Sequence, residues 1–105
     1  MSWDASIRVH TGISWHEVED IDSYTFNVSE MYCKAGYCIG NASGERCDII
    51  LPILHDLYKE LKSNPEEYKK YNPLNGWGNY EGALKFLSHI IEACERHPSA
   101  YLFMY

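Results

Sequence analysis

The sequence predicts an α+β fold, in which a small antiparallel sheet of three or four strands packs against two or three helices. Segments near both ends of the chain are rich in β-branched and aromatic residues, as strands are, while the second half carries two long stretches with apolar residues at helical spacing. The length of 105 residues corresponds to one domain, residues 1–105.

The first third of the chain predicts three strands. "SIRVH-TG-ISWHEVE" is typical of a hairpin, with Thr11-Gly12 as its turn, and "EDIDS" predicts a break after it. "YTFNVS" alternates cleanly, so Tyr24, Phe26 and Val28 should share one face of a strand. Its opposite face is polar and includes Asn27 and Ser29.

A short helical turn and a loop are predicted over "EMYCKAGYCIGNASG", which contains three glycines and no sustained period. An amphipathic helix follows from about residue 45, because its apolar residues recur at spacings of three and four. These residues are Ile50, Leu54, Leu57 and Leu61. Pro52 lies within this stretch and predicts either a kink or a helix start close to it.

Two more helices are predicted from their capping signals. Asn64 and Pro65 form a cap and first position, with Glu67 three residues after the cap, and Asn79 is a favourable cap for the last helix. The apolar stripe of that helix is Leu84, Leu87, Ile91 and Cys94. "RHPSA" then ends it at Pro98.

The terminal segment "YLFMY" is apolar on both faces. Such a strand is typically buried on both sides, so we expect it to be central in the sheet or covered at a homodimer interface. The expected partner strand is "YTFNVS", which places the C-terminal strand inside the sheet.

Acidic residues are concentrated near the N-terminus. Residues 1–30 contain six carboxylates and a single cation, Arg8, although the whole chain carries a net charge of only −6. This balance argues against direct nucleic-acid binding, which needs a basic face. An acidic patch can attract a basic partner, or it can simply keep the protein soluble.

The four cysteines and five histidines show no metal-binding spacing. Without a recognisable secretory signal we expect all four thiols to be reduced and the protein to lie in the cytoplasm, with no membrane segment. No cofactor, metal or catalytic residue is predicted. A weaker alternative is a small hydrolase or transferase that uses His55 or His89, which lie on predicted helices without an obvious partner.

The segment "NPLNGWGNY" is the candidate site. Gly76 and Gly78 flank Trp77 and give the backbone unusual freedom there, while the loop leads directly into the Asn79 helix start, where free N–H groups can hold an anion. Trp77 and Tyr80 could stack a planar ligand, and Asn72 and Asn75 offer hydrogen bonds. Asn27 and Ser29 could line the same cleft. The alternative is that Trp77 simply fills the core.

Several of these motifs resemble a family of small uncharacterised bacterial proteins that also occur in phages and prophages. The resemblance rests on "TFNVSEMYCKAG", a proline-bearing helix, "SNPEEYKKYNPLNGWGNYEGALKFL" and "IIEACERHPSA", and it covers about residues 23–100. Its most specific part is the Asn-Pro-x-Asn-Gly-Trp-Gly-x-Tyr core. Family members usually have proline where this chain has Glu30, and residues 1–22 look like an acidic hairpin extension outside the family core of residues 23–105.

This resemblance implies an accessory protein of mobile elements, among which counter-defence proteins and regulatory binders are common, in the host cytoplasm if it is phage-encoded. We expect a non-enzymatic protein that sequesters a small polar or nucleotide-like ligand through the Asn72–Tyr80 loop. The alternative is a protein-interaction module that inhibits a host protein through its acidic N-terminal hairpin. In that case, deletion of the hairpin should leave the remaining domain folded.

Overall fold

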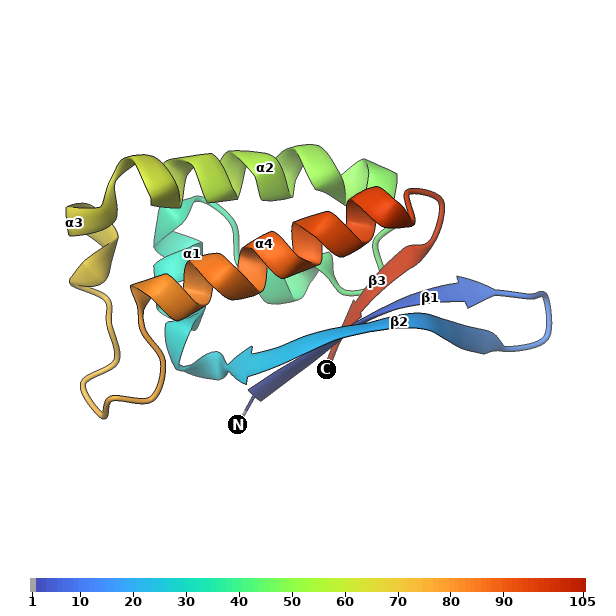
Figure 1. Ribbon diagram of the computed structural model, residues 1–105, viewed down its shortest axis with the longest axis horizontal. Coiled ribbons are helices and arrows are strands. Elements are labelled where there is room, and N and C mark those ends of the chain that lie inside the picture. Colours follow the sequence, from blue (N-terminus) through green and yellow to red (C-terminus); the bar gives the residue numbers. More distant parts are fainter. Residues whose placement is uncertain (1) are drawn as a thin grey trace.

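A computed structural model describes residues 2–105 and shows an α+β fold in which the helices lie on one side of a three-stranded antiparallel sheet (Figure 1). The elements in chain order are β1 (Ser2–His10), β2 (Trp15–Thr25), a 3-10 turn η1 (Phe26–Val28), α1 (Ser29–Ala35), a 3-10 turn η2 (Ile39–Ala42), α2 (Cys47–Ser63), α3 (Pro65–Lys69), α4 (Tyr80–Arg96) and β3 (Tyr101–Met104). No helix in this described part of the chain is long and apolar enough to cross a membrane.

The strand order is β2-β1-β3, so β1 is the central strand. The predicted hairpin is confirmed, since β1 and β2 pair from Ser2↔Thr25 to His10↔Trp15. Its turn is the four-residue segment Thr11–Ser14, not the predicted two residues, and the Thr11 N–H donates to the Ser14 carbonyl at 3.0 Å. Trp3, Ala5 and Ile7 of β1 are at most 8% exposed, so the central strand supplies part of the core.

The predicted break at "EDIDS" is wrong, because β2 runs through it. The carboxylates of Glu19 and Asp22 form hydrogen bonds with basic side chains in α4 and at its C-terminal end. The Arg96 Nε and the His97 Nε2 each lie 3.1 Å from Glu19 Oε1, and His89 Nδ1 lies 3.1 Å from Asp22 Oδ2. Acidic residues are uncommon in strands, and here contacts with a neighbouring helix stabilise them.

The C-terminal strand is paired as predicted, but its partner and position differ. It pairs with β1, from Ala5↔Met104 to Arg8↔Tyr101, and forms one edge of the sheet. It does not pair with "YTFNVS", because β1, which lies between the two, takes that place.

The two apolar faces of β3 are both covered within a single chain. Leu102 and Met104 are buried in the core. On the other face Trp15 packs edge-on against Phe103 at a centroid distance of 5.0 Å, and the Arg8 guanidinium lies 4.7 Å from the ring centroid of Tyr105. The homodimer stays a prediction, but burial of β3 does not require a second chain, because both faces of the strand are covered by residues of the same chain.

The predicted strand "YTFNVS" ends at Thr25, and its second half is helical. Thr25 Oγ1 accepts a hydrogen bond from the Asn27 N–H at 3.2 Å, and Ser29 Oγ donates to the Phe26 carbonyl at 2.5 Å. These local side-chain bonds favour a turn over an extended backbone. Val28 is still fully buried, so the apolar alternation identified a packing residue although it predicted the wrong backbone.

The predicted helices are present, and their apolar stripes form most of the core. The fully or nearly fully buried members are Ile50, Leu54, Leu57, Leu61, Leu87, Ile91 and Cys94, while Leu84 is partly buried. Pro52 lies inside α2, which begins five residues earlier at Cys47. Asn64 precedes α3 as predicted, but its Nδ2 donates to Glu60 at 3.1 Å and its side chain does not cap α3.

The prediction that all four thiols are free is wrong for one pair. Cys33 and Cys38 form a disulfide, with their Cα atoms 4.2 Å apart. Gly36, at φ +126°, reverses the chain after α1 and brings the two residues together. Cys47 and Cys94 are free and buried, as expected of small apolar residues.

Candidate functional site

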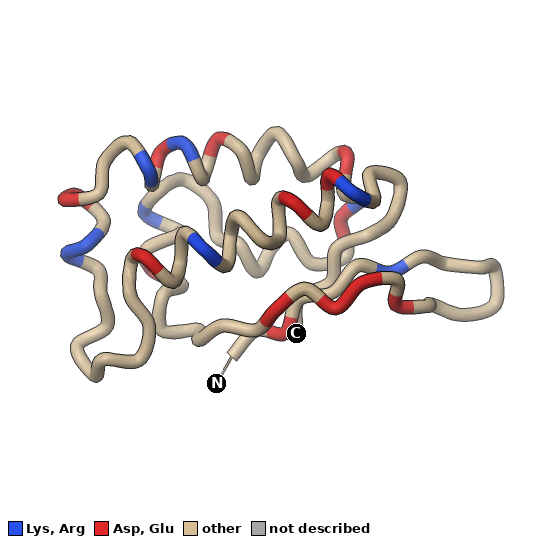
Figure 2. The backbone as a smooth tube through the Cα atoms, viewed as in Figure 1, with Lys and Arg blue, Asp and Glu red and all other residues tan. Residues whose placement is uncertain are grey.

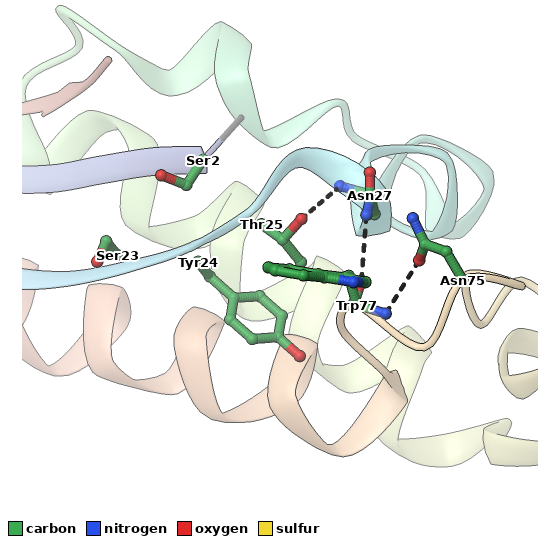
Figure 3. A pocket seen from close by; sticks show the side chains of 7 residues that line it. All are labelled: Ser2, Ser23, Tyr24, Thr25, Asn27, Asn75 and Trp77. Atoms are coloured by element: carbon green, nitrogen blue, oxygen red, sulfur yellow. Dashed lines mark hydrogen bonds between the residues drawn. The ribbon is translucent and has the colours of Figure 1, made fainter.

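An open cleft of about 640 Å³ lies between the Asn72–Tyr80 loop and the segment where β2 runs into η1 (Figure 3). Its lining side chains are polar or aromatic and none is charged. They are Ser2, Ser23, Tyr24, Thr25, Asn27, Asn75 and Trp77. The volume falls within the range of small-molecule sites in proteins, roughly 300–1,000 Å³.

Two asparagine side chains hold the backbone of Trp77. The Trp77 N–H donates to Asn75 Oδ1 at 2.9 Å, which closes a local turn, and Gly76 between them adopts φ +77°. From the other wall of the cleft, Asn27 Nδ2 donates to the Trp77 carbonyl at 3.3 Å. Both polar backbone groups of this residue are therefore bonded, and its position is fixed relative to both walls.

Trp77 itself is exposed. The residue is 70% exposed, and Figure 3 shows the indole projecting into the cleft toward Tyr24 and Thr25. The alternative that Trp77 fills the core is wrong. A large ring held on a fixed backbone and left facing solvent is a feature of contact surfaces.

Gly78 allows the loop to lie directly against η1. It adopts φ +97°, and an added Cβ would lie 2.6 Å from Thr25 Cγ2 and 3.2 Å from Val28 Cγ1. Only glycine combines this backbone conformation with such a close approach. The second glycine of the motif therefore allows the close contact between the loop and residues Thr25 and Val28.

The start of α4 is fixed by side chains from three parts of the chain. Asn79 Oδ1 accepts from the Gly82 N–H at 2.7 Å, so this predicted cap is confirmed. Asn72 Oδ1 accepts from the Tyr80 N–H at 2.8 Å, and the Tyr24 hydroxyl accepts from the Asn79 N–H at 3.0 Å. Because these donors are already bonded, the geometry does not support the anion-binding role expected of this helix start.

The structure brings some of the predicted residues into the cleft and places others around it. Asn27, Asn75 and Trp77 line it, and Asn72, Gly76, Gly78 and Asn79 shape the loop behind it. Ser29 bonds to its own turn, outside the cleft.

Tyr80 is a core residue, so the prediction that it stacks a ligand is wrong. It is 5% exposed, and its hydroxyl donates to the Leu61 carbonyl at 2.5 Å. Desolvation on burial raises the pKa of this phenol.

Sequence reasoning missed four lining residues, Ser2, Ser23, Tyr24 and Thr25. One signal was present for Tyr24. Gly82 lies inside a helix, where glycine is unfavourable, and an added Cβ there would lie 1.9 Å from the Tyr24 hydroxyl oxygen. A glycine in the first turn of a predicted helix thus marked a close approach by another side chain.

The electrostatic character of the site is neutral. Neither the 72–80 loop nor the 23–28 segment contains a charged residue, and Figure 2 shows the charged positions elsewhere, along β2 and the helices. Within residues 2–105, no three His, Cys, Asp or Glu side chains gather in a way that could hold a metal ion.

His55 and His89, the candidates for a hydrolytic site, each face a carboxylate. His55 Nε2 lies 3.6 Å from Glu95 Oε2, and His89 bonds Asp22. Neither histidine lines the cleft beside Trp77.

Comparison of the chain with protein-family models, with curated proteins and with solved structures finds no match. The resemblance to the phage and prophage family therefore stays a prediction.

Proposed function

We propose that this protein is a non-enzymatic binding protein that sequesters a small, planar, uncharged ligand in the cleft beside Trp77. The indole would stack on the ligand, and the amides of Asn27 and Asn75 would orient it. Such a role agrees with the accessory proteins of mobile elements that the sequence resembles.

The observation that supports this proposal is the exposure of Trp77 on a fixed backbone. An apolar ring exposed to 70% is unfavourable in water, yet two asparagines and two positive-φ glycines hold its backbone in place. A ligand that covers the ring removes that unfavourable exposure, and little conformational entropy is lost because the loop is already ordered.

The remaining amide groups suggest what the ligand offers. Asn27 Nδ2 bonds Trp77, and within residues 2–105 the Asn27 Oδ1 has no hydrogen-bond donor, so it can accept a bond from a ligand. Asn75 Oδ1 bonds Trp77, and its Nδ2 has no acceptor among the same residues, so it can donate to a ligand. One free acceptor and one free donor among the lining residues would suit a ring edge that carries both N–H and C=O groups, as nucleobases do. No lysine or arginine lines the cleft to balance a phosphate, so a base or nucleoside fits better than a nucleotide.

The test is titration calorimetry of the purified protein with nucleobases, nucleosides and their monophosphates, supported by native mass spectrometry of the protein as purified. We expect at least one nucleoside or base to bind, and its monophosphate to bind no more tightly. Trp77→Ala should remove binding while reducing the free energy of unfolding by no more than about 2 kcal/mol, since only about a third of a roughly 250 Å² side chain is buried.

Trp15→Ala is the matched control, because Trp15 is also partly exposed but lies on the outer face of the hairpin. It should leave binding unchanged. The proposal fails if Trp77→Ala binds normally, if both tryptophan variants lose binding equally, or if no base, nucleoside or other planar neutral compound binds to the folded protein.

A further inference from the structure

The two edges of the sheet differ in how they are closed. The outer edge of β3 is bonded by the segment that follows η2, since the Gly44 N–H donates to the Leu102 carbonyl at 2.7 Å and the Leu102 N–H donates to the Glu45 carbonyl at 2.9 Å. β2 forms the other edge over 11 residues, and no residue of β2 makes a backbone hydrogen bond outside the hairpin within the described chain. A strand of this length with unpaired N–H and C=O groups can accept another strand.

The hairpin also projects from the body of the protein. The molecule measures 45 × 26 × 17 Å, and Figure 1 shows the distal part of β1 and β2 extending past the helices. Apolar side chains on this arm are exposed, with Ile13 at 94%, Trp15 at 45% and Val18 at 43%. Two-stranded arms with exposed apolar side chains are typical of contact surfaces.

The charges along β2 indicate which partner fits. Glu19 and Asp22 are bonded by basic groups of α4, whereas Glu17 and Asp20 are exposed and make no ion pair within residues 2–105. Figure 2 shows the acidic positions clustered along this strand. Arg8 lies opposite Glu17 in the register, but its guanidinium makes cation–π contacts with the rings of Phe103 and Tyr105 and forms no ion pair with Glu17 within residues 2–105.

We propose that the free edge of β2 docks a basic, extended segment of a partner protein, which adds as a fourth strand. Main-chain hydrogen bonds to β2 would supply register, Trp15 and Ile13 would contact the apolar side chains of the segment, and Glu17 and Asp20 would pair with its lysines or arginines. A second copy of this chain fits poorly, because antiparallel pairing of β2 with itself would bring the carboxylates of residues 17–22 together.

The test uses a labelled peptide of about the length of β2 in which lysine alternates with threonine or valine, titrated with the full-length protein by fluorescence anisotropy. A peptide with glutamate in place of lysine is the charge control. We expect the lysine peptide to bind, with an affinity that falls as salt rises, and to slow amide hydrogen exchange in residues 15–22, outside the part of β2 that lines the cleft.

The double variant Glu17→Gln/Asp20→Asn should weaken binding about two- to 30-fold, the range for two exposed ion pairs. Its matched control is Asp56→Asn/Glu92→Gln, which removes the same charges from exposed positions of α2 and α4 and should leave binding unchanged. Equal losses in both double variants would mean general charge attraction and would overturn the proposal.

Three further results would also overturn it. They are no binding of the lysine peptide up to about 1 mM, equal binding of the glutamate peptide, and protection from exchange anywhere except β2. Concentration-dependent dimerisation with protection of β2 in the absence of peptide would assign this edge to a second copy of the chain instead.

Discussion

Gly78→Ala tests whether the loop must lie directly against η1. The added methyl group would meet Thr25 Cγ2 at 2.6 Å, closer than carbon atoms approach, at a backbone φ of +97°. Thr25 cannot rotate away freely, because its Oγ1 accepts the Asn27 N–H bond that starts η1. The loop must therefore move away from β2, which opens the cleft.

The expected loss is the sum of two effects. A left-handed conformation costs a non-glycine residue about 1 kcal/mol, and overpacking costs about 1–3 kcal/mol. We expect the free energy of unfolding to fall by about 3 kcal/mol in urea denaturation followed by circular dichroism. For a domain of this size that corresponds to a Tm lower by roughly 14 °C.

Gly76→Ala is the control in the same loop. Gly76 also has a positive φ, +77°, but an added Cβ there meets nothing within 4 Å, so only about 1 kcal/mol should be lost. Thr25→Ser removes Cγ2 while keeping the hydroxyl, and should recover part of the loss in the Gly78→Ala background. Equal losses in the two glycine variants, or no recovery with Thr25→Ser, would refute the close-approach argument.

Three other perturbations follow from the fold. Deletion of residues 1–22 should unfold the protein, because it removes the central strand β1, whereas the sequence alone suggested that the rest would stay folded. A native circular dichroism spectrum and cooperative melting of the deletion variant would contradict this. The hydrogen bond from Arg96, together with His97, lowers the pKa of Glu19 below its ordinary value of 4.5, so the stability that Glu19 contributes is present above that pH and lost as pH falls below it. Glu19→Gln should cost about 1 kcal/mol at pH 7 and flatten the acid limb of the stability profile, and an unchanged limb would show that Glu19 is not its source. Tyr24→Phe removes the acceptor of the Asn79 N–H and should cost about 1 kcal/mol and speed hydrogen exchange at the start of α4; unaltered exchange there would exclude that role.

Secondary structure was predictable where local pattern and burial agree. The apolar residues of α2 and α4, spaced three and four apart, mark faces that are buried in the core, and the Asn79 cap forms as its residue type predicts. At "EDIDS" the local composition was misleading, because Arg96, His97 and His89 stabilise the acidic strand from more than 60 residues away. Pairing of β3 with β1 is a similarly nonlocal choice, which depends on how the whole sheet packs.

The candidate site was predictable in part, for a comparable reason. The two glycines that flank Trp77 predicted a loop with unusual backbone conformations, and both Gly76 and Gly78 adopt positive φ. The sequence could not show whether the indole faces inward or outward, because that depends on the far wall of the cleft. Asn27, Tyr24 and Thr25 form that wall about 50 residues earlier in the chain, and their contacts decide the position of the loop.

The two proposed surfaces differ in physical character, and this difference separates them by experiment. The cleft beside Trp77 is lined by uncharged groups, so binding of a neutral ring there should vary little between low and high salt. On β2, Glu17 and Asp20 make no ion pair within residues 2–105, so docking of a basic segment should weaken as the ionic strength rises. A ligand whose affinity is insensitive to salt and lost in Trp77→Ala would therefore be assigned to the cleft. A salt-sensitive partner that is retained by Trp77→Ala and weakened by Glu17→Gln/Asp20→Asn would be assigned to β2, and neither result could be produced by the other surface.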